Sequence, residues 1–151
     1  MTIKIRIAEQ EDLITVVDMQ EAHRLEVDAY ESLSFNRELC MENMKLIIDH
    51  PLHLILVAYE EGSEDILAYC WLVSFQPHYS TDFYYSEAYT YIIPKRRKSS
   101  ILARFIDKAK LISRYSGAKY LHFGSFSGNK QLSEAYHTRY ARVGEVFNVQ
   151  L

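Results

Sequence analysis

The chain has 151 residues, of which 48% are hydrophobic and 25% charged, and its formal net charge is −3 at pH 7. These values predict one ordinary globular domain over residues 1–151 and exclude a general binder of polyanions. Cys40 and Cys70 are too few for a disulfide scaffold and lack the spacing of a metal site, so we expect free thiols, no metal and a reducing compartment. The N-terminus lacks an apolar signal core, and no stretch approaches the ~18 apolar residues of a membrane span, so we expect a cytoplasmic protein without a membrane partner.

The first half of the chain predicts a strand, two helices and a hairpin. Residues 3–8 alternate apolar and charged side chains, as in a strand with one solvated face. Residues 9–27 begin with acids, which suit a helix N-terminus, and carry apolar residues at near-helical spacing. A second helix is expected over residues 36–49, where a proline follows. The period then falls to two, and strands 52–60 and 66–75 flank a polar turn.

The second half alternates strands and helices. Gly117 is expected to cap the C-terminus of the helix at residues 100–115. A strand–helix–strand unit needs a parallel strand pair, whereas the three-strand meander is antiparallel. The order therefore predicts an α/β or α+β fold, a mixed sheet with helices on both faces. The expected elements are a strand at 82–93, a helix at 100–115, a strand parallel to the first at 119–126, a helix at 129–139 and a strand at 144–151.

Four consecutive cations, residues 95–98, lie between a predicted strand and a predicted helix in the segment YIIPKRRKSSILARF. A helix N-terminus has free backbone N–H groups and a positive dipole end, so added cations predict a site for phosphate. A nucleic-acid backbone is the alternative ligand. The acidic total charge and the single basic cluster argue against it.

The order of elements and this loop together resemble the GNAT superfamily of acyl-CoA-dependent N-acyltransferases over essentially the whole chain. The family signature has V-x-P at the end of a strand and then [RQ]-x-x-G-x-[GA] at the start of a long helix. Ile92-Ile93-Pro94 matches its first part, and residues 97–102 match the second except that Ser100 and Leu102 replace small residues. Glycine there would let phosphate approach the backbone closely. The resemblance implies that acetyl-CoA is held by Ile92, Ile93, Lys95, Arg96, Arg97, Lys98, Ser99, Ser100, Ile101 and Leu102.

A second element of the resemblance lies near the C-terminus. The family often carries an asparagine after the fifth strand and a tyrosine seven residues later, and Asn129 and Tyr136 have that separation. This implies that both residues contact the cofactor and that Tyr136 is the general acid for the leaving thiolate. Tyr140, one helical turn further on, has Gly144 four residues beyond it and is the alternative acid. Judged by itself, Tyr136 is better explained as a partly buried aromatic residue that closes the helix against the sheet, and only the basic loop makes the two interpretations equal.

Glu87 is the candidate general base. Alternation places Glu87, Tyr89 and Tyr91 on one face of the strand unless a bulge intervenes, and a carboxylate buried among aromatic residues has a raised pKa. Some members of the family keep a glutamate base at this position. The alternative is an exposed glutamate on a solvated face. His122 is a reserve base, and no Ser-His-Asp signature occurs.

The resemblance implies an N-acetyltransferase in which an amine attacks acetyl-CoA directly in a ternary complex. The acceptor, a small-molecule amine or a protein or peptide amine, cannot be read from the sequence. Glu26, Asp28 and Glu31 would suit a cationic amine, or they are simply solvated. The rival is a GNAT-like protein without turnover that binds coenzyme A or a partner protein, as the changed signature at residues 100 and 102 suggests. Members of this family often dimerise, so the resemblance also allows a homodimer.

Overall fold

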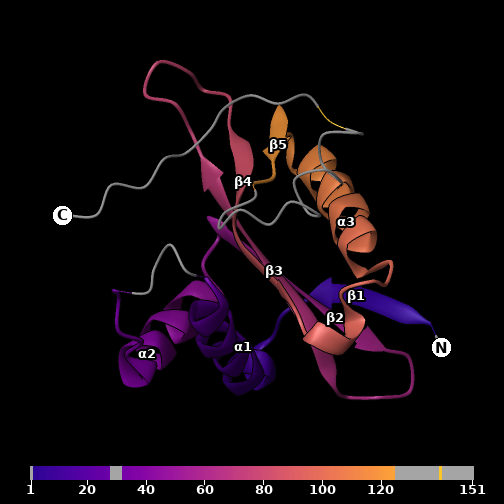
Figure 1. Cartoon of the computed structure of the whole chain (residues 1–151). Helices are drawn as coiled ribbons and strands as arrows, with labels where there is room; N and C mark the ends of the chain where they lie inside the picture. The colour runs from indigo at the N-terminus through magenta and orange to yellow at the C-terminus, as the bar shows by residue number, and fades with distance from the viewer. Residues whose placement is uncertain (1, 28–31, 125–139, 141–151) are drawn as a thin grey trace.

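The described residues fold around a five-stranded sheet in the order β1-β2-β3-β4-β5. The computed structural model describes residues 2–27, 32–124 and 140. Strands β1 to β4 pair antiparallel, whereas β4 and β5 are parallel (Figure 1). The mixed sheet and the parallel pair predicted for residues 82–93 and 119–126 are therefore confirmed. The strands are β1 (Ile3–Ile7), β2 (His53–Glu60), β3 (Ile66–Phe75), β4 (Tyr84–Ile92) and β5 (Tyr120–His122).

Helices cover both faces of the sheet, as predicted (Figure 1). α1 (Leu13–Glu26) and α2 (Arg37–Ile47) pack on one face and α3 (Ile101–Ser116) on the other. The central strands are buried on both sides, because successive side chains of a strand point to opposite faces. In β2, for example, Leu56 belongs to the core cluster under α3, and the next residue, Val57, belongs to the cluster under α1 and α2.

Local sequence signals account for the helix ends. Asn36 precedes α2, and its side-chain oxygen accepts a hydrogen bond from the Leu39 N–H at 3.0 Å. Gly117 follows α3 with φ of 82°, which confirms it as the predicted cap. The helix predicted from residue 9 begins instead with a short 3-10 turn, η1 (Gln10–Asp12), before α1.

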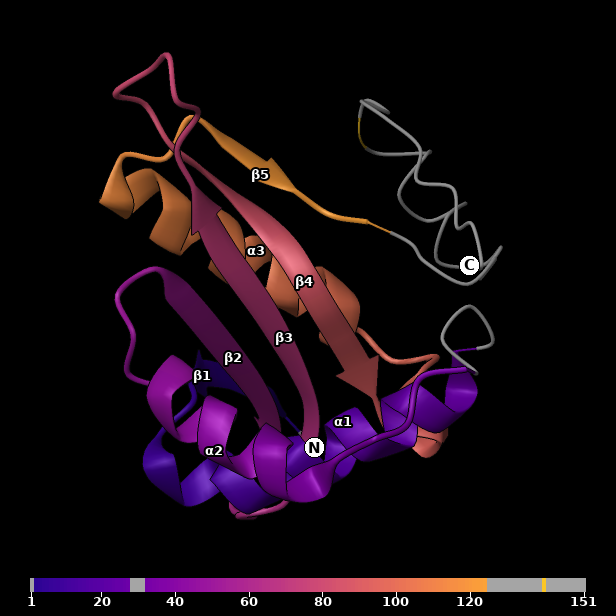
Figure 2. The same cartoon turned by 90° about the vertical axis from the view of Figure 1, so that its left-hand side faces the viewer.

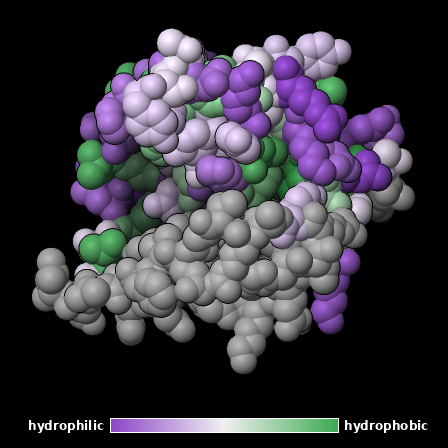
Figure 3. Space-filling view, turned by 90° about the horizontal axis from the view of Figure 1, so that it is seen from above, coloured by the Kyte–Doolittle hydropathy of each residue, from purple (hydrophilic) through white to green (hydrophobic). Residues whose placement is uncertain are grey.

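Two predicted elements, the helix at 129–139 and the strand at 144–151, lie outside the described residues. Within the part that the structure describes, no helix combines the length and the apolar character that a membrane crossing requires. On the face seen in Figure 3, hydrophilic side chains of the described residues surround smaller apolar groups.

A buried ion pair ties the edge strand β1 to the start of α1. Both guanidinium nitrogens of Arg6 donate to Asp12, at 2.6 and 2.9 Å, and the Glu9 N–H donates to the same carboxylate at 2.9 Å. Asp12 is only 6% exposed. Burial alone would raise the pKa of Asp12, but the hydrogen bonds from Arg6 and Glu9 hold it below its usual value. The folded state therefore favours the ionised carboxylate.

We expect Asp12→Asn to lower the free energy of unfolding by about 3 kcal/mol at neutral pH, because it leaves Arg6 partly buried without its counter-charge. Part of this stabilisation should disappear at low pH, as the pH falls through the depressed pKa of Asp12. The measurement is urea unfolding followed by circular dichroism. Glu61→Gln is the control, since Glu61 forms a solvated pair with Lys4 and should contribute less than about 1 kcal/mol. Equal effects of the two variants would contradict the prediction.

Candidate functional site

Strands β4 and β5 pair over only three residues and then diverge. Their parallel register runs from Tyr84 opposite Tyr120 to Ser86 opposite His122. β4 continues to Ile92 beyond that point, and Figure 2 shows β5 turning away from it. In the described part of the chain, the outer edge of β4 from Glu87 onward therefore has no neighbouring strand.

A β-bulge lies where the two strands part. Trp71 of β3 is opposite Tyr89, but the next residue, Leu72, is opposite Glu87, so β4 contains one extra residue at Ala88. The extra residue reverses the alternation of side chains. The prediction that Glu87, Tyr89 and Tyr91 share a face is wrong for this reason. Glu87 lies on the α3 side with Leu72, whereas the tyrosines lie on the α1 side with Trp71.

Glu87 is a partly buried carboxylate at the point of divergence. One of its oxygens accepts a hydrogen bond from the Gly124 N–H, beyond the end of β5, at 2.9 Å. Burial raises the pKa of Glu87 to about 7, although the Thr90 hydroxyl and the Gly124 N–H offset part of the shift. Glu87 is thus not the exposed glutamate of the alternative interpretation. A group that titrates near neutral pH can both accept and return a proton.

The two arginines of the basic run are engaged by carboxylates from elsewhere in the fold. Arg96, in the 3-10 turn η3 (Pro94–Arg96), forms an ion pair with Glu60 at the end of β2. Arg97 donates to Glu26 at 2.5 Å and to the Ile92 carbonyl at 2.9 Å. Its guanidinium also lies 5.4 Å from the centre of the Tyr91 ring. These arginines hold the loop against the sheet and α1.

The other two cations of the run, Lys95 and Lys98, are exposed and have no ion-pair partner among the described residues. The backbone beside them also offers donors. The N–H groups of Leu102 and Ala103 at the start of α3 have no acceptor within the part of the chain that the structure describes, as expected for a helix N-terminus. Exposed cations and unpaired backbone donors at a helix N-terminus are the groups that phosphate binding uses.

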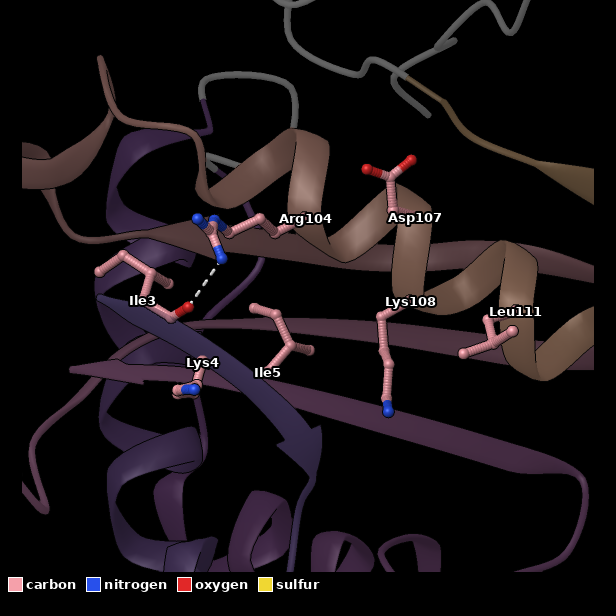
Figure 4. A pocket seen from close by; sticks show the side chains of 7 residues that line it. All are labelled: Ile3, Lys4, Ile5, Arg104, Asp107, Lys108 and Leu111. Atoms are coloured by element: carbon pink, nitrogen blue, oxygen red, sulfur yellow. Dashed lines mark hydrogen bonds between the residues drawn. The ribbon is translucent and has the colours of Figure 1, made fainter. Parts of the chain in front are cut away.

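The residues that depart from the family signature have other contacts. The Ser100 hydroxyl oxygen accepts a hydrogen bond from Arg104 Nε at 3.2 Å, and Arg104 Nη1 donates to the Ile3 carbonyl at 2.9 Å. Figure 4 shows Arg104 reaching from α3 to the edge of β1, above a shallow groove of about 390 Å³. Ser100 therefore belongs to the anchor that joins α3 to β1. Leu102 is half-buried and lies outside both core clusters.

The remaining residues of the predicted cofactor loop hold it in place through hydrogen bonds and burial. The Ile93 N–H donates to the Leu67 carbonyl at 3.1 Å and so extends the pairing of β4 with β3. The Ser99 hydroxyl oxygen accepts from the Ile101 N–H at 3.3 Å, and the side chain of Ile101 is fully buried in the core under α3.

The predicted acids are only partly described. Asn129 and Tyr136 lie outside the described residues. Tyr140 is 37% exposed, and its hydroxyl accepts a hydrogen bond from Lys110 Nζ of α3 at 3.3 Å. His122, the reserve base, lies on β5 with its ring centre 4.7 Å from that of Tyr84. The assignment of the general acid remains a prediction.

Sequence reasoning missed two features of this site. The carboxylates of Glu26 and Glu60 are 71 and 36 residues away from their arginine partners, and no local pattern links them. The second feature is a continuous series of aromatic rings on the α1 side of the sheet, the aromatic row. The abundance of aromatic residues in strand 82–93 was its only signal. The row consists, in order, of His50, His53, Trp71, Tyr89, His23 and Tyr91.

The raised pKa of Glu87 predicts that stability falls as the pH rises. Between about pH 4.5 and pH 7 the folded protein keeps the Glu87 proton while the unfolded chain releases it. The free energy of unfolding should therefore fall by up to about 3 kcal/mol across this window. Glu87→Gln should remove this decline in urea unfolding measured at a series of pH values. Glu42→Gln, on the exposed side of α2, should leave it unchanged. A decline of the same size in the Glu87 variant would show that another group causes it.

No family model and no curated protein matches the sequence. Similarity appears at the level of structure. A GNAT family acetyltransferase from Staphylococcus aureus has a TM-score of 0.67 at 17% identity, with 100% of each chain covered. A predicted acetyltransferase with acetyl-CoA from Clostridium acetobutylicum has a TM-score of 0.74 at 14% identity and covers 99% of this chain and 96% of its own.

An aminoglycoside antibiotic 6'-N-acetyltransferase from Acinetobacter baumannii has a TM-score of 0.72 at 13% identity, with 99% of this chain and 98% of that one covered. At these identities the similarity concerns the fold. It agrees with the sheet order, the parallel β4–β5 pair and the helices on both faces described above. This chain has the fold of the GNAT-family acetyltransferases, as its sequence predicted.

Proposed function

We propose that this protein is an N-acetyltransferase that transfers an acetyl group from acetyl-CoA to an amine. The observation that carries the proposal is Glu87, a carboxylate with a pKa of about 7 at a bulge where two parallel strands diverge. The strand that carries it leads directly into a cationic helix N-terminus. A proton acceptor and an anion site on one strand are what amine acetylation from an anionic donor requires.

The residues present fit coenzyme A. Lys95 and Lys98 offer charge, and the N–H groups of Leu102 and Ala103 offer hydrogen bonds, to the pyrophosphate. Arg97 acts differently from the role that the family signature suggests, because its side chain is committed to Glu26 and Ile92. It positions the loop and leaves phosphate binding to its neighbours. When bound, coenzyme A supplies the activated acetyl group as a thioester.

The chemistry follows from the proton balance of the reaction. A bond forms between the amine nitrogen and the acetyl carbon, and the bond from that carbon to sulfur breaks. Glu87 accepts the proton that the amine must lose, directly or through a water molecule at the free edge of β4. Tyr136 or Tyr140 returns a proton to the leaving thiolate. One such group contributes roughly 10²–10⁴-fold to a rate.

One observation favours the rival function, a protein of this fold that binds coenzyme A or a partner without turnover. The ion pairs of Arg96 and Arg97 neutralise half of the basic run. In addition, Leu102 stands where the family has a small residue. These features weaken an anion site but leave Glu87 unexplained. A buried carboxylate with a raised pKa is costly to the fold, and catalysis gives a reason to retain it.

We expect Lys95→Ala combined with Lys98→Ala to weaken acetyl-CoA binding at least tenfold, a loss of about 1.4 kcal/mol, in isothermal titration calorimetry. Both side chains are exposed, so folding should be unaffected. The charge-matched control is Lys45→Ala combined with Lys108→Ala, on α2 and in the middle of α3. If the unaltered protein shows no binding at millimolar acetyl-CoA, the acetyltransferase proposal fails.

Turnover, followed as release of free thiol with a panel of amines, should show a pH–rate profile that rises towards a pKa of about 7. Glu87→Gln should abolish or shift this rising limb. Tyr136→Phe and Tyr140→Phe keep the ring and remove only the hydroxyl, so one of them should lower the rate of the folded enzyme. If both variants keep the rate within about a factor of two, neither hydroxyl is the acid.

A further inference from the structure

The aromatic row is a continuous path of ring contacts across four elements. Neighbouring ring centres in it are 5.1, 5.6, 5.7, 5.9 and 5.7 Å apart. It starts at His50, after α2, crosses β2, β3 and β4, and includes His23 of α1 between the two tyrosines. Its last ring, Tyr91, contacts the Arg97 guanidinium, so the row ends at the basic run.

The middle of the row is open to solvent beside the bulge. Tyr89 is 42% exposed, and Trp71 and His23 on either side of it are half-buried. Tyr89 is two residues from Glu87, across the extra residue Ala88, where β4 has lost its pairing with β5. A molecule that lies on the Tyr89 ring would therefore be beside the free edge of β4, on the other side of the strand from the Glu87 side chain.

Two of the three histidines of the row, His23 and His53, favour the neutral form. Burial lowers the pKa of both His23 and His53. Independently, His53 Nδ1 accepts a hydrogen bond from the Trp71 indole N–H at 3.1 Å, which requires that nitrogen to be unprotonated. The face offers flat, neutral rings, which favour stacking with another ring and also attract an ammonium group placed over the ring of Trp71 or Tyr89.

Most of the carboxylates that the described residues bring to this face are paired with arginines, and two of the acids named from the sequence, Asp28 and Glu31, lie outside the described residues. Asp18 and Glu21, on the exposed side of α1, both pair with Arg37, and Glu26 at the end of α1 pairs with Arg97. Glu26 also accepts a hydrogen bond from the Tyr91 hydroxyl at 3.2 Å. Among the described residues of α1, these three carboxylates share two arginines, so the pairs leave one negative charge near the row, which suits a single ammonium group better than a polycation.

We propose that the aromatic row is the acceptor site and that it selects a primary amine carried on an aromatic ring over polycations such as polyamines or aminoglycosides. This inference rests on the proposed acetyltransferase function and names its substrate class. The aromatic body lies on Tyr89 and Trp71, and the amine reaches the edge of β4. The reaction itself is the one given above, with one N–C bond formed, one C–S bond broken and the amine proton removed.

Trp71 is the only tryptophan of the chain, so its fluorescence reports directly on the row. The test is titration with 2-phenylethylamine and, separately, with spermidine, using excitation at which only tryptophan absorbs and with acetyl-CoA present. Phenylethylamine should change the Trp71 emission saturably, at a concentration at least tenfold lower than spermidine. Equal or tighter binding of spermidine would overturn the proposal.

Variants locate the binding on the row. Tyr89→Ala should weaken phenylethylamine binding at least tenfold, whereas Tyr89→Phe, which retains the ring, should keep it. Tyr115→Ala, which removes an 86% exposed ring on α3, should have no effect. Thermal unfolding checks that each variant is folded, and if Tyr89→Ala is not, the milder Tyr89→Leu replaces it. Unchanged binding by a folded Tyr89 variant without the ring would contradict the proposal.

The same samples test the acetyltransferase function and the acceptor site separately. Calorimetry with acetyl-CoA tests the acetyltransferase function without any acceptor. If acetyl-CoA binds but phenylethylamine leaves Trp71 unaffected, the aromatic acceptor site is wrong and the proposed function stands. If acetyl-CoA does not bind, the acetyltransferase function is wrong, and with it the role of the row as an acceptor site.

Discussion

One extra residue in β4 determines how this site is built. The bulge at Ala88 lets a single strand present a carboxylate to one face of the sheet and tyrosines to the other within three residues. Without it, Glu87 and Tyr89 would project to the same side, where the carboxylate would have to be buried among the rings of the aromatic row. The bulge thus separates an ionisable group from an apolar surface while keeping both at the free edge of β4.

A hydrogen bond from the chain just after β5 makes the placement of Glu87 less costly. A carboxylate withdrawn from water without partners would be strongly destabilising in its charged form. The Gly124 N–H, just after β5, supplies one hydrogen bond. Divergence of β5 from β4 therefore has two consequences. It opens the edge of β4, and it brings a backbone donor to the carboxylate, so that the pKa of Glu87 is raised to about 7 but not further.

Long-range contacts give the four cations of the basic run different roles. In the sequence, four adjacent cations look equivalent. In the fold, Arg96 and Arg97 reach carboxylates on β2 and α1, and Lys95 and Lys98 have no ion-pair partner among the described residues. Planar guanidinium groups are suited to such fixed, directional pairing, whereas lysines serve as mobile point charges. The arginines fix the conformation of the loop, and the lysines supply the positive charge that a ligand would meet.

These contrasts explain what the sequence could and could not predict. Strand and helix positions followed from the periods of apolar residues and from caps such as Asn36 and Gly117, because those signals act within a few residues. The loop and Glu87 were identified as candidates by the same local means. The bulge was not, because the segment YYSEAYTYI is aromatic or small at nearly every position and suits either register.

The aromatic row escaped prediction for a related reason. Its members come from α1, the turn after α2, and three strands, so only the pairing of those strands makes them neighbours. Trp71 meets Tyr89 because the two are directly opposite in the β3–β4 register, and that register is fixed by the bulge. If the extra residue were Thr90 in place of Ala88, Trp71 would be opposite Ala88, and the row would be broken. The feature that sets the proton acceptor on one side of β4 therefore also assembles the ring surface on the other, so base and acceptor site depend on one local irregularity.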